Sequence, residues 1–178
     1  AAILEEGLKY GAFRLAMRNN AEARCHLDAV LVGALIAMGF ALIEDVEYSI
    51  FGNFYTLIRA VLPLHAFFGT ITGYYYGKAK AAGSMKYHVL SLAVPIFGHT
   101  IYDMWIVAIK RILDAAGVAA ETLTEEELLA LPYGEYLEPL GYVAIATMVV
   151  FFILIVMTFR KISQWSRNEE LQESIVAQ

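Results

Sequence analysis

Several ionisable side chains of this chain lie inside apolar runs that are long enough to cross a membrane. They fall in four runs: Glu5, Glu6 and Lys9; Glu44, Asp45 and Glu47; Arg59 and His65; His99 and Asp103. In hydrocarbon an ionisable group is costly unless it is paired or hydrated, so a carboxylate or imidazole there marks a functional site by default. The four runs together predict one polar site assembled inside a bilayer.

The composition indicates a polytopic membrane protein. Hydrophobic residues make up 59% of the 178 residues and charged residues 17%, whereas soluble domains have roughly 45–50% and about 25%. The net charge of -5, without a basic stripe, argues against nucleic-acid binding. The single cysteine excludes an internal disulfide. The sequence opens on a polar motif without a signal-peptide pattern, so we expect further helices upstream.

The apolar runs predict an all-α bundle of about five membrane-spanning helices. The predicted spans are residues 3–18, 27–51, 56–77, 86–109 and 139–159. Residues 1–161 would form the membrane core and residues 162–178 a polar tail. The acidic segment 112–138 lies between the last two spans, and Thr124 followed by three glutamates predicts a helix N-cap there. Gly83 and Ser84 predict a turn between the third and fourth spans.

Lysine and arginine predict the orientation in the cell membrane, because they concentrate on the cytoplasmic side. They follow the first, third and fifth spans: Arg14, Arg18 and Arg24; Lys78, Lys80 and Lys86; Arg160, Lys161 and Arg167. If every span crosses, these groups share the cytoplasmic side with the C-terminal tail. At about 1.5 Å per helical residue, Glu5, His65 and His99 then reach nearly the same depth, in the outer half of a ~30 Å core.

The acidic motifs each allow a structural and a functional interpretation. Glu5 and Lys9 have the i,i+4 order favoured for an ion pair, which would neutralise charge in lipid. Alternatively, Glu5 or Glu6 is a general base that activates water. Glu44 and Tyr48 share one helix face, either within the site or where the helix emerges at the interface.

The histidine motifs also leave two interpretations open. His65 precedes Gly69 and Gly73 on one face, where small residues allow close helix packing and an interhelical hydrogen bond. His99 and Asp103, at i,i+4, suit a carboxylate that orients an imidazole, or two metal ligands. The sequence lacks a GxSxG elbow and an HExxH motif, so a serine nucleophile is disfavoured and an ordinary zinc-protease helix is excluded.

The four motifs, in this order, resemble those of the PrsW family of intramembrane proteases, related to the CAAX prenyl proteases and the Abi proteins. The matching residues are Glu5-Glu6-x-x-Lys9; Asp28, Gly39-Phe40-Ala41, Glu44 and Tyr48; Arg59, His65 and Gly73; and His99-x-x-x-Asp103. The family usually has Asn after the second-motif glutamate, where this chain has Asp45. The resemblance covers about residues 3–110.

The resemblance implies hydrolysis of a peptide bond in a membrane-anchored protein, with an anti-sigma factor as one such substrate. Glu5, with Glu6, would be the base that activates water, and His65 would assist. His99 and Asp103 would polarise the scissile carbonyl or hold the oxyanion, although Asp103 donates only when protonated and could instead orient His99. The supporting residues would be Lys9, Glu44, Tyr48 and Arg59.

The resemblance leaves the use of a metal open, because members of this group have been described both as metalloproteases and as glutamate proteases. We expect no metal, with zinc at His65, His99 and Asp103 as the alternative. The competing functional class is a non-catalytic membrane protein. A proton-coupled transporter or a pseudoprotease also buries ionisable groups, but inverted repeats, which would favour a transporter, are not found in the five spans. The sequence makes no prediction of oligomeric state.

Overall fold

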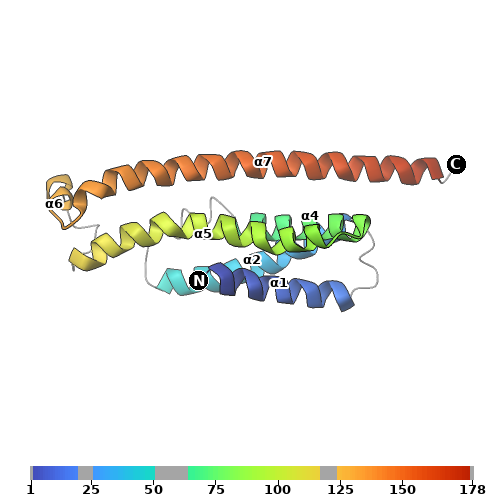
Figure 1. The fold of residues 1–178 in the computed structure, drawn as a ribbon, viewed down its shortest axis with the longest axis horizontal. Helices are drawn as coiled ribbons and strands as arrows, with labels where there is room; N and C mark the ends of the chain where they lie inside the picture. The colour runs from blue at the N-terminus through green and yellow to red at the C-terminus, as the bar shows by residue number, and fades with distance from the viewer. Residues whose placement is uncertain (1, 20–25, 51–63, 117–123, 177–178) are drawn as a thin grey trace. The chain divides into compact units, whose positions relative to one another are not determined.

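The computed structural model describes residues 2–19, 26–50, 64–116 and 124–176. These residues are almost entirely helical (Figure 1). The elements are α1 (Ala2–Asn19), α2 (His26–Ile50), α4 (Leu64–Ala82), α5 (Met85–Ala116), α6 (Glu125–Leu129), the 3-10 helix η2 (Gly134–Tyr136) and α7 (Leu137–Val176). No strand occurs in these ranges, so the predicted all-α fold is confirmed.

Within the described residues, three segments are long and apolar enough to cross a membrane: Leu27–Val46, Met85–Ile109 and Gly134–Asn168. α1 covers the predicted span 3–18, while the first half of the predicted span 56–77 lies mostly outside the described residues. α7 is a single helix of 40 residues, so it is about 60 Å long, twice the thickness of a ~30 Å hydrocarbon core. It runs beyond the predicted span end at residue 159 and through most of the segment predicted as a polar tail.

The chain divides into two compact units. The first comprises residues 1–99 and 155–178, and it contains α1, α2, α4, the start of α5 and the end of α7. The second comprises residues 100–154, with the rest of α5, α6, η2 and the start of α7. Of the predicted catalytic residues, only Asp103 belongs to the second unit.

α2 and α4 are in direct backbone contact through small residues. A Cβ atom on Gly69 would lie 2.6 Å from the Cβ of Ala37 and would collide with the carbonyl oxygen of Gly33. A Cβ on Gly73 would collide with the carbonyl oxygen of Ala29. Since only glycine leaves room for such an approach, the prediction that Gly69 and Gly73 mark a close helix contact is confirmed.

Local signals in the sequence set the ends of two helices. Gly83 follows α4 with φ of 58°, and the N–H of Ser84 donates to the carbonyl of Ala79 at 3.2 Å, as in a Schellman motif. Thr124 Oγ1 accepts from the N–H of Glu127 at 3.3 Å, and the Glu127 carboxylate accepts from the N–H of Thr124 at 2.8 Å. This reciprocal capping box starts α6, so the predicted turn and the predicted N-cap are both confirmed.

The first unit buries a small apolar core and exposes many large apolar side chains. Its buried cluster contains Phe13, Met17, Ala29 and Tyr76. The outer faces of its helices expose other apolar side chains: Ile3, Leu4, Leu8 and Leu15 on α1, and Leu31, Leu35, Leu42 and Ile43 on α2. Exposed apolar area on this scale is typical of a surface that contacts lipid.

Candidate active site

Polar side chains from four helices of the first unit meet around one position. Glu6 and Lys9 lie on consecutive turns of α1, Glu44 lies on α2, His65 is in the first turn of α4, and His99 is on α5. The rings of His65 and His99 meet edge to face, with centroids 5.1 Å apart. Lys9, Glu6, His65 and His99 are all buried. Buried charges must be paired and hydrogen-bonded to be tolerated, and each of these groups has a polar partner within hydrogen-bond distance.

Lys9 joins the acidic motif to the first histidine. Its Nζ donates to Glu6 Oε1 at 2.8 Å and lies 2.8 Å from His65 Nδ1. An ammonium group can only donate, so His65 Nδ1 accepts this bond and the ring proton lies on Nε2. His65 Nε2 is 2.9 Å from Glu44 Oε2, to which it donates. Both ring nitrogens of His65 are therefore occupied by protein groups.

Glu6 continues this chain of hydrogen bonds to the second histidine. Its Oε1 lies 2.9 Å from His99 Nδ1. A carboxylate accepts, so the proton of His99 lies on Nδ1, and Nε2 is the ring nitrogen directed at Glu5. The two histidines are thus held in opposite tautomers by one lysine and one glutamate.

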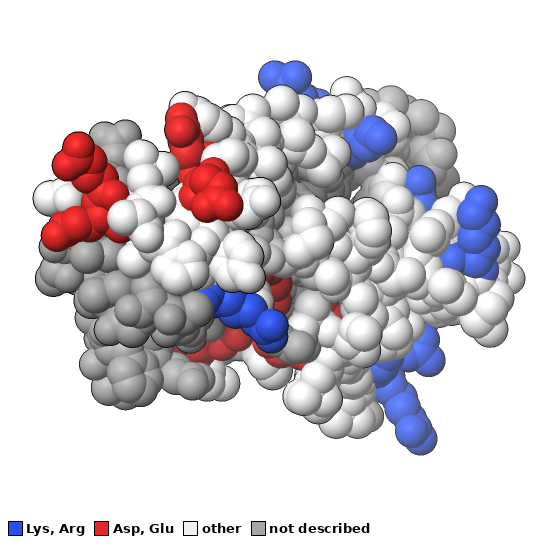
Figure 2. All heavy atoms as spheres, turned by 60° about the vertical axis from the view of Figure 1, so that its left-hand side comes forward, with Lys and Arg blue, Asp and Glu red and all other residues white. Residues whose placement is uncertain are grey.

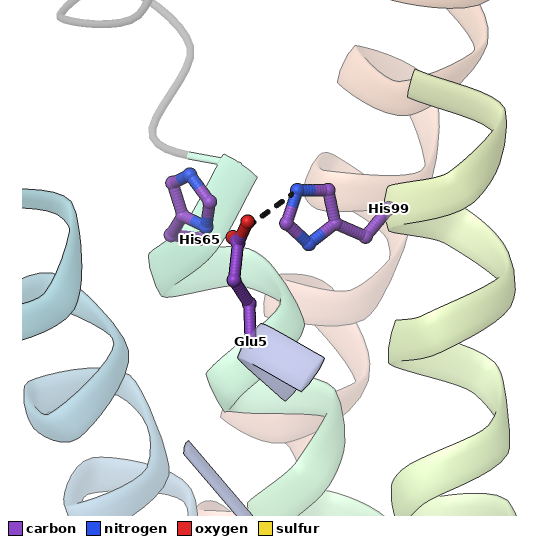
Figure 3. A group of neighbouring side chains, drawn as sticks. All are labelled: Glu5, His65 and His99. Carbon is purple, nitrogen blue, oxygen red and sulfur yellow. Dashed lines mark ion pairs between the residues drawn. The ribbon is translucent and has the colours of Figure 1, made fainter. Parts of the chain in front are cut away.

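Glu5 differs from the other polar residues of this cluster because one of its carboxylate oxygens lacks a hydrogen bond within the described part of the chain. Its side chain is 21% exposed, yet its Oε2 atom is buried and has no hydrogen-bond partner among the described residues. This oxygen lies 3.7 Å from His99 Nε2. Figure 3 shows the Glu5 carboxylate between the two imidazole rings, which reach it from α4 and α5. A buried, unpartnered carboxylate oxygen opposite an imidazole nitrogen fits a bound water or a cation.

A metal ion also fits the donor set in part. Glu5, His65 and His99 each offer a ligand atom, all within 4.8 Å of one another. Zinc is bound by such nitrogen and oxygen atoms at about 2.0–2.2 Å. The bond from Glu6 to the other nitrogen of His99 is the outer-shell support that metal-binding histidines commonly have. His65 would have to release Lys9 or Glu44 to join, because both of its nitrogens are bonded.

The aromatic and glycine neighbours of His99 were not singled out from the sequence. The ring of Phe68 stacks on His99 with centroids 5.9 Å apart. A Cβ on Gly98 would lie 2.7 Å from Cε1 of Phe68, so glycine at this position leaves space for the stacked ring. The signal available in the sequence is the spacing of Phe68, three residues after His65 and so on the same helix face.

The structure corrects one predicted pair. Lys9 bonds to Glu6, at i,i+3, instead of Glu5 at i,i+4, because Lys9 is also directed at His65. Asp103 lies one helical turn beyond His99 and is half-buried in the second unit. From the sequence, His65, His99 and Asp103 are the possible zinc ligands. Among the residues that the structure describes, the group of potential ligands is His65, His99 and Glu5. Two supporting residues cannot be compared: Arg59 and the side chain of Tyr48 lie outside the described residues.

Comparison with known proteins identifies relatives of this chain. Residues 1–133 match the sequence profile of the family described as "PrsW family intramembrane metalloprotease". Protease PrsW of Bacillus subtilis (strain 168) is 35% identical over 117 residues, covering 62% of this chain and 54% of that protein. Protease PrsW of Oceanobacillus iheyensis is 38% identical over 107 residues, covering 57% and 50%.

These relatives are longer proteins, and this chain spans about half the length of those it matches. Protease PrsW of Clostridioides difficile (strain 630) gives a similar coverage, at 30% identity over 115 residues, 58% of this chain and 48% of that protein. No solved structure matches the chain. Because the family profile covers well over half of the sequence, including all four polar motifs, the chain belongs to the PrsW family.

Proposed function

We propose that this chain is an intramembrane endopeptidase that hydrolyses a peptide bond of a membrane-anchored protein, with Glu5 as the base that activates water. The observation that carries the proposal is the buried Oε2 atom of Glu5, which has no hydrogen-bond partner among the described residues and faces His99 Nε2 at 3.7 Å. A water held there would lose a proton to the carboxylate as its oxygen attacks the scissile carbonyl carbon. The same proton can then pass to the departing amide nitrogen.

The hydrogen bonds distinguish the two adjacent glutamates. Glu6 is already bonded to Lys9 and His99, so its role is to hold these groups in position. Glu5 has an oxygen available for a reactant. His99, supported from behind by Glu6, lies where it can orient the water or the carbonyl group. We assign His65 to positioning and Asp103 to support of the oxyanion or of His99; the motif resemblance supports both roles.

A metal-free mechanism is the form that we propose. Catalytic zinc usually has three protein ligands, and here His65 is held through both ring nitrogens by Lys9 and Glu44. The family description names a metalloprotease, and Glu5 and His99 would hold such an ion, with His65 as the third ligand. When bound, a metal polarises a carbonyl and lowers the pKa of a bound water.

From the loop charges we propose that the site lies in the outer half of the membrane and that the C-terminal tail is cytoplasmic. A substrate with an extracytoplasmic cut site, such as a membrane-anchored anti-sigma factor, would suit this placement. The three segments long and apolar enough to cross a membrane support the membrane location.

The test is cleavage of a labelled single-span substrate in proteoliposomes. Glu5→Gln should abolish cleavage and preserve helicity, whereas the matched control Glu135→Gln, at an exposed position in η2, should retain full activity. Full activity of Glu5→Gln would exclude Glu5 as the base. The metal-free mechanism predicts that protein without bound zinc still cleaves the substrate after exhaustive chelation. If chelation abolishes cleavage and added zinc restores it, the mechanism is metal-dependent.

A further inference from the structure

A second cluster in the first unit combines lysine, arginine and aromatic rings at the end of α4. Lys78 Nζ lies 4.7 Å from the ring centroid of Tyr74 and 5.8 Å from that of Tyr87. Lys80 Nζ lies 5.7 Å from the ring of Tyr76. These separations are within the range of cation–π attraction, so the rings restrict where the cations can lie.

The cluster extends over four helices. Arg14 of α1 lies 5.3 Å from the ring of Tyr76, which it shares with Lys80. Tyr74 packs against Trp165 of α7 with ring centroids 5.4 Å apart, and Tyr75 stacks on Tyr87 of α5 at 6.4 Å. We call the following set the basic–aromatic belt: Arg14, Lys78 and Lys80, with Tyr74, Tyr75, Tyr76, Tyr87 and Trp165.

The belt lies at the boundary between polar and apolar parts of the unit. Its lysines precede the turn at Gly83 in the sequence and Tyr87 follows it, and the apolar segment Met85–Ile109 begins two residues after that glycine. Next to it, α5 exposes Met85 (73%) and Val89 (59%). Tyrosine and tryptophan are enriched where a helix leaves the hydrocarbon, and lysine stems extend from there towards the headgroups. Because these side chains begin a segment long and apolar enough to cross a membrane, a lipid is a better occupant of this surface than a soluble protein.

The positive charge of the belt is not balanced by the described residues. Among the described residues, no carboxylate forms an ion pair with Arg14, Lys78 or Lys80; these cations contact aromatic rings. On the right-hand side of Figure 2 the described surface carries Lys and Arg, and no Asp or Glu is visible there in this view. The hydrogen bond to Tyr74 raises the pKa of Lys78 above its ordinary value.

We propose that the basic–aromatic belt is a binding surface for the headgroup of an anionic phospholipid. The phosphodiester would lie between the cations that share the tyrosine rings, where it relieves their mutual repulsion. The ring faces would contact the glycerol region, and the exposed side chains of α5 would contact the acyl chains. The surface should therefore prefer phosphatidylglycerol over phosphatidylcholine, and this preference does not depend on proteolysis.

Trp165 provides a reporter inside the belt. The chain has two tryptophans, so Trp105→Phe leaves Trp165 as the single fluorophore. This protein is placed in phosphatidylcholine nanodiscs that contain a small fraction of lipid brominated on its acyl chains, either phosphatidylglycerol or phosphatidylcholine. Brominated phosphatidylglycerol should quench Trp165 more strongly. Equal quenching by the two lipids would overturn the proposal.

The contribution of the lysines is tested by Lys78→Gln combined with Lys80→Gln. Each lysine near an anionic headgroup strengthens association roughly fivefold, so loss of the pair should lower the preference for phosphatidylglycerol by about 25-fold. Lys110→Gln with Arg111→Gln removes the same charge from the far part of α5 and should leave the preference unchanged. A preference that persists in the belt variant, or that falls equally in the control, contradicts the proposal.

The salt dependence of quenching tests the same proposal in protein that keeps all of its belt residues, so its result does not depend on whether the lysine variant folds. At 1 M salt the screening length falls to about 3 Å from about 10 Å at 0.1 M. The preference for brominated phosphatidylglycerol should fall steeply over this range if charges in the belt carry it. Quenching that does not change with salt would show that contact with Trp165 is independent of the headgroup charge, and it would refute the binding surface.

Discussion

Lys9→Met is the substitution that should disturb the candidate site most without touching the proposed base. Methionine fills a similar volume but has no charge and no donor. The Glu6 carboxylate, 3% exposed, would keep the bond from His99 and lose its cation. Removing one partner of a buried ion pair costs about 3–5 kcal/mol, and an acceptor left without a donor, here His65 Nδ1, costs about 1–3 kcal/mol.

These two costs arise from the same side chain and do not simply add, because the carboxylate can take up a proton. We expect the free energy of unfolding to fall by about 3 kcal/mol. The measurement is reversible unfolding in mixed micelles of mild detergent and dodecyl sulfate, followed by circular dichroism. The matched control is Lys86→Met, an exposed lysine in the same unit, for which a change within about 0.5 kcal/mol is expected.

A double-mutant cycle separates the Lys9–Glu6 interaction from other effects of the substitution. Residues in one hydrogen-bonded network couple by about 0.5–3 kcal/mol, so Lys9→Met and Glu6→Gln should cost less together than the sum of their separate costs. Loss of the tautomer-fixing bonds should also slow peptide cleavage by about 10²-fold, as small misplacements of reacting groups do. Strict additivity, together with a Lys9→Met stability equal to that of Lys86→Met, would refute the hydrogen-bond chain as described.

Three further changes test other parts of the structure. Gly69→Ala should lower the free energy of unfolding by about 1–3 kcal/mol because its Cβ would collide with α2. Gly7→Ala is the control, because a Cβ there faces open space and should not lower it. Equal effects of the two substitutions in unfolding assays would contradict the close contact. Glu44→Leu should lower the free energy of unfolding by about 1–3 kcal/mol because it leaves His65 Nε2–H without an acceptor. Glu44→Gln still offers a carbonyl oxygen and should lower it less. The reverse order would contradict the assigned tautomer. Hydrogen bonds from Thr124 hold the pKa of Glu127 below its ordinary value of 4.5, so this carboxylate stabilises the start of α6 above that pH, and the contribution is lost as the pH falls through the lowered value. The protection of residues 124–129 against hydrogen exchange, taken relative to the intrinsic exchange rate at each pH, should therefore fall in acid, and a pH response unchanged by Thr124→Ala would contradict the cap.

The sequence predicts the helices well because their signals are local. Apolar length marks the membrane segments, a glycine with positive φ ends α4, and a threonine followed by glutamates starts α6. Hydropathy alone, however, ends the last helix too early. The residues after 159 are polar but are good helix formers, such as Arg, Lys, Gln and Glu, so α7 continues to Val176.

The side-chain partners in the site are beyond what sequence spacing can predict. On an isolated helix, Glu5 and Glu6 are both within reach of Lys9 at i,i+4 and i,i+3. The choice of Glu6 is made by His65 and His99, which come from α4 and α5. Likewise, the bond from His65 to Glu44 depends on the close approach of α2 and α4, which small residues indicate without fixing which polar groups meet.

The backbone contact between α2 and α4 at Gly33 and Gly69 also bears on the candidate site. The same two helices carry the Glu44–His65 ion pair, so the close contact and the ion pair both join α2 to α4. Glu5, with its side chain 21% exposed, marks the open side, on α1. The exposed edge of Glu5 therefore lies on a different helix from the close α2–α4 contact.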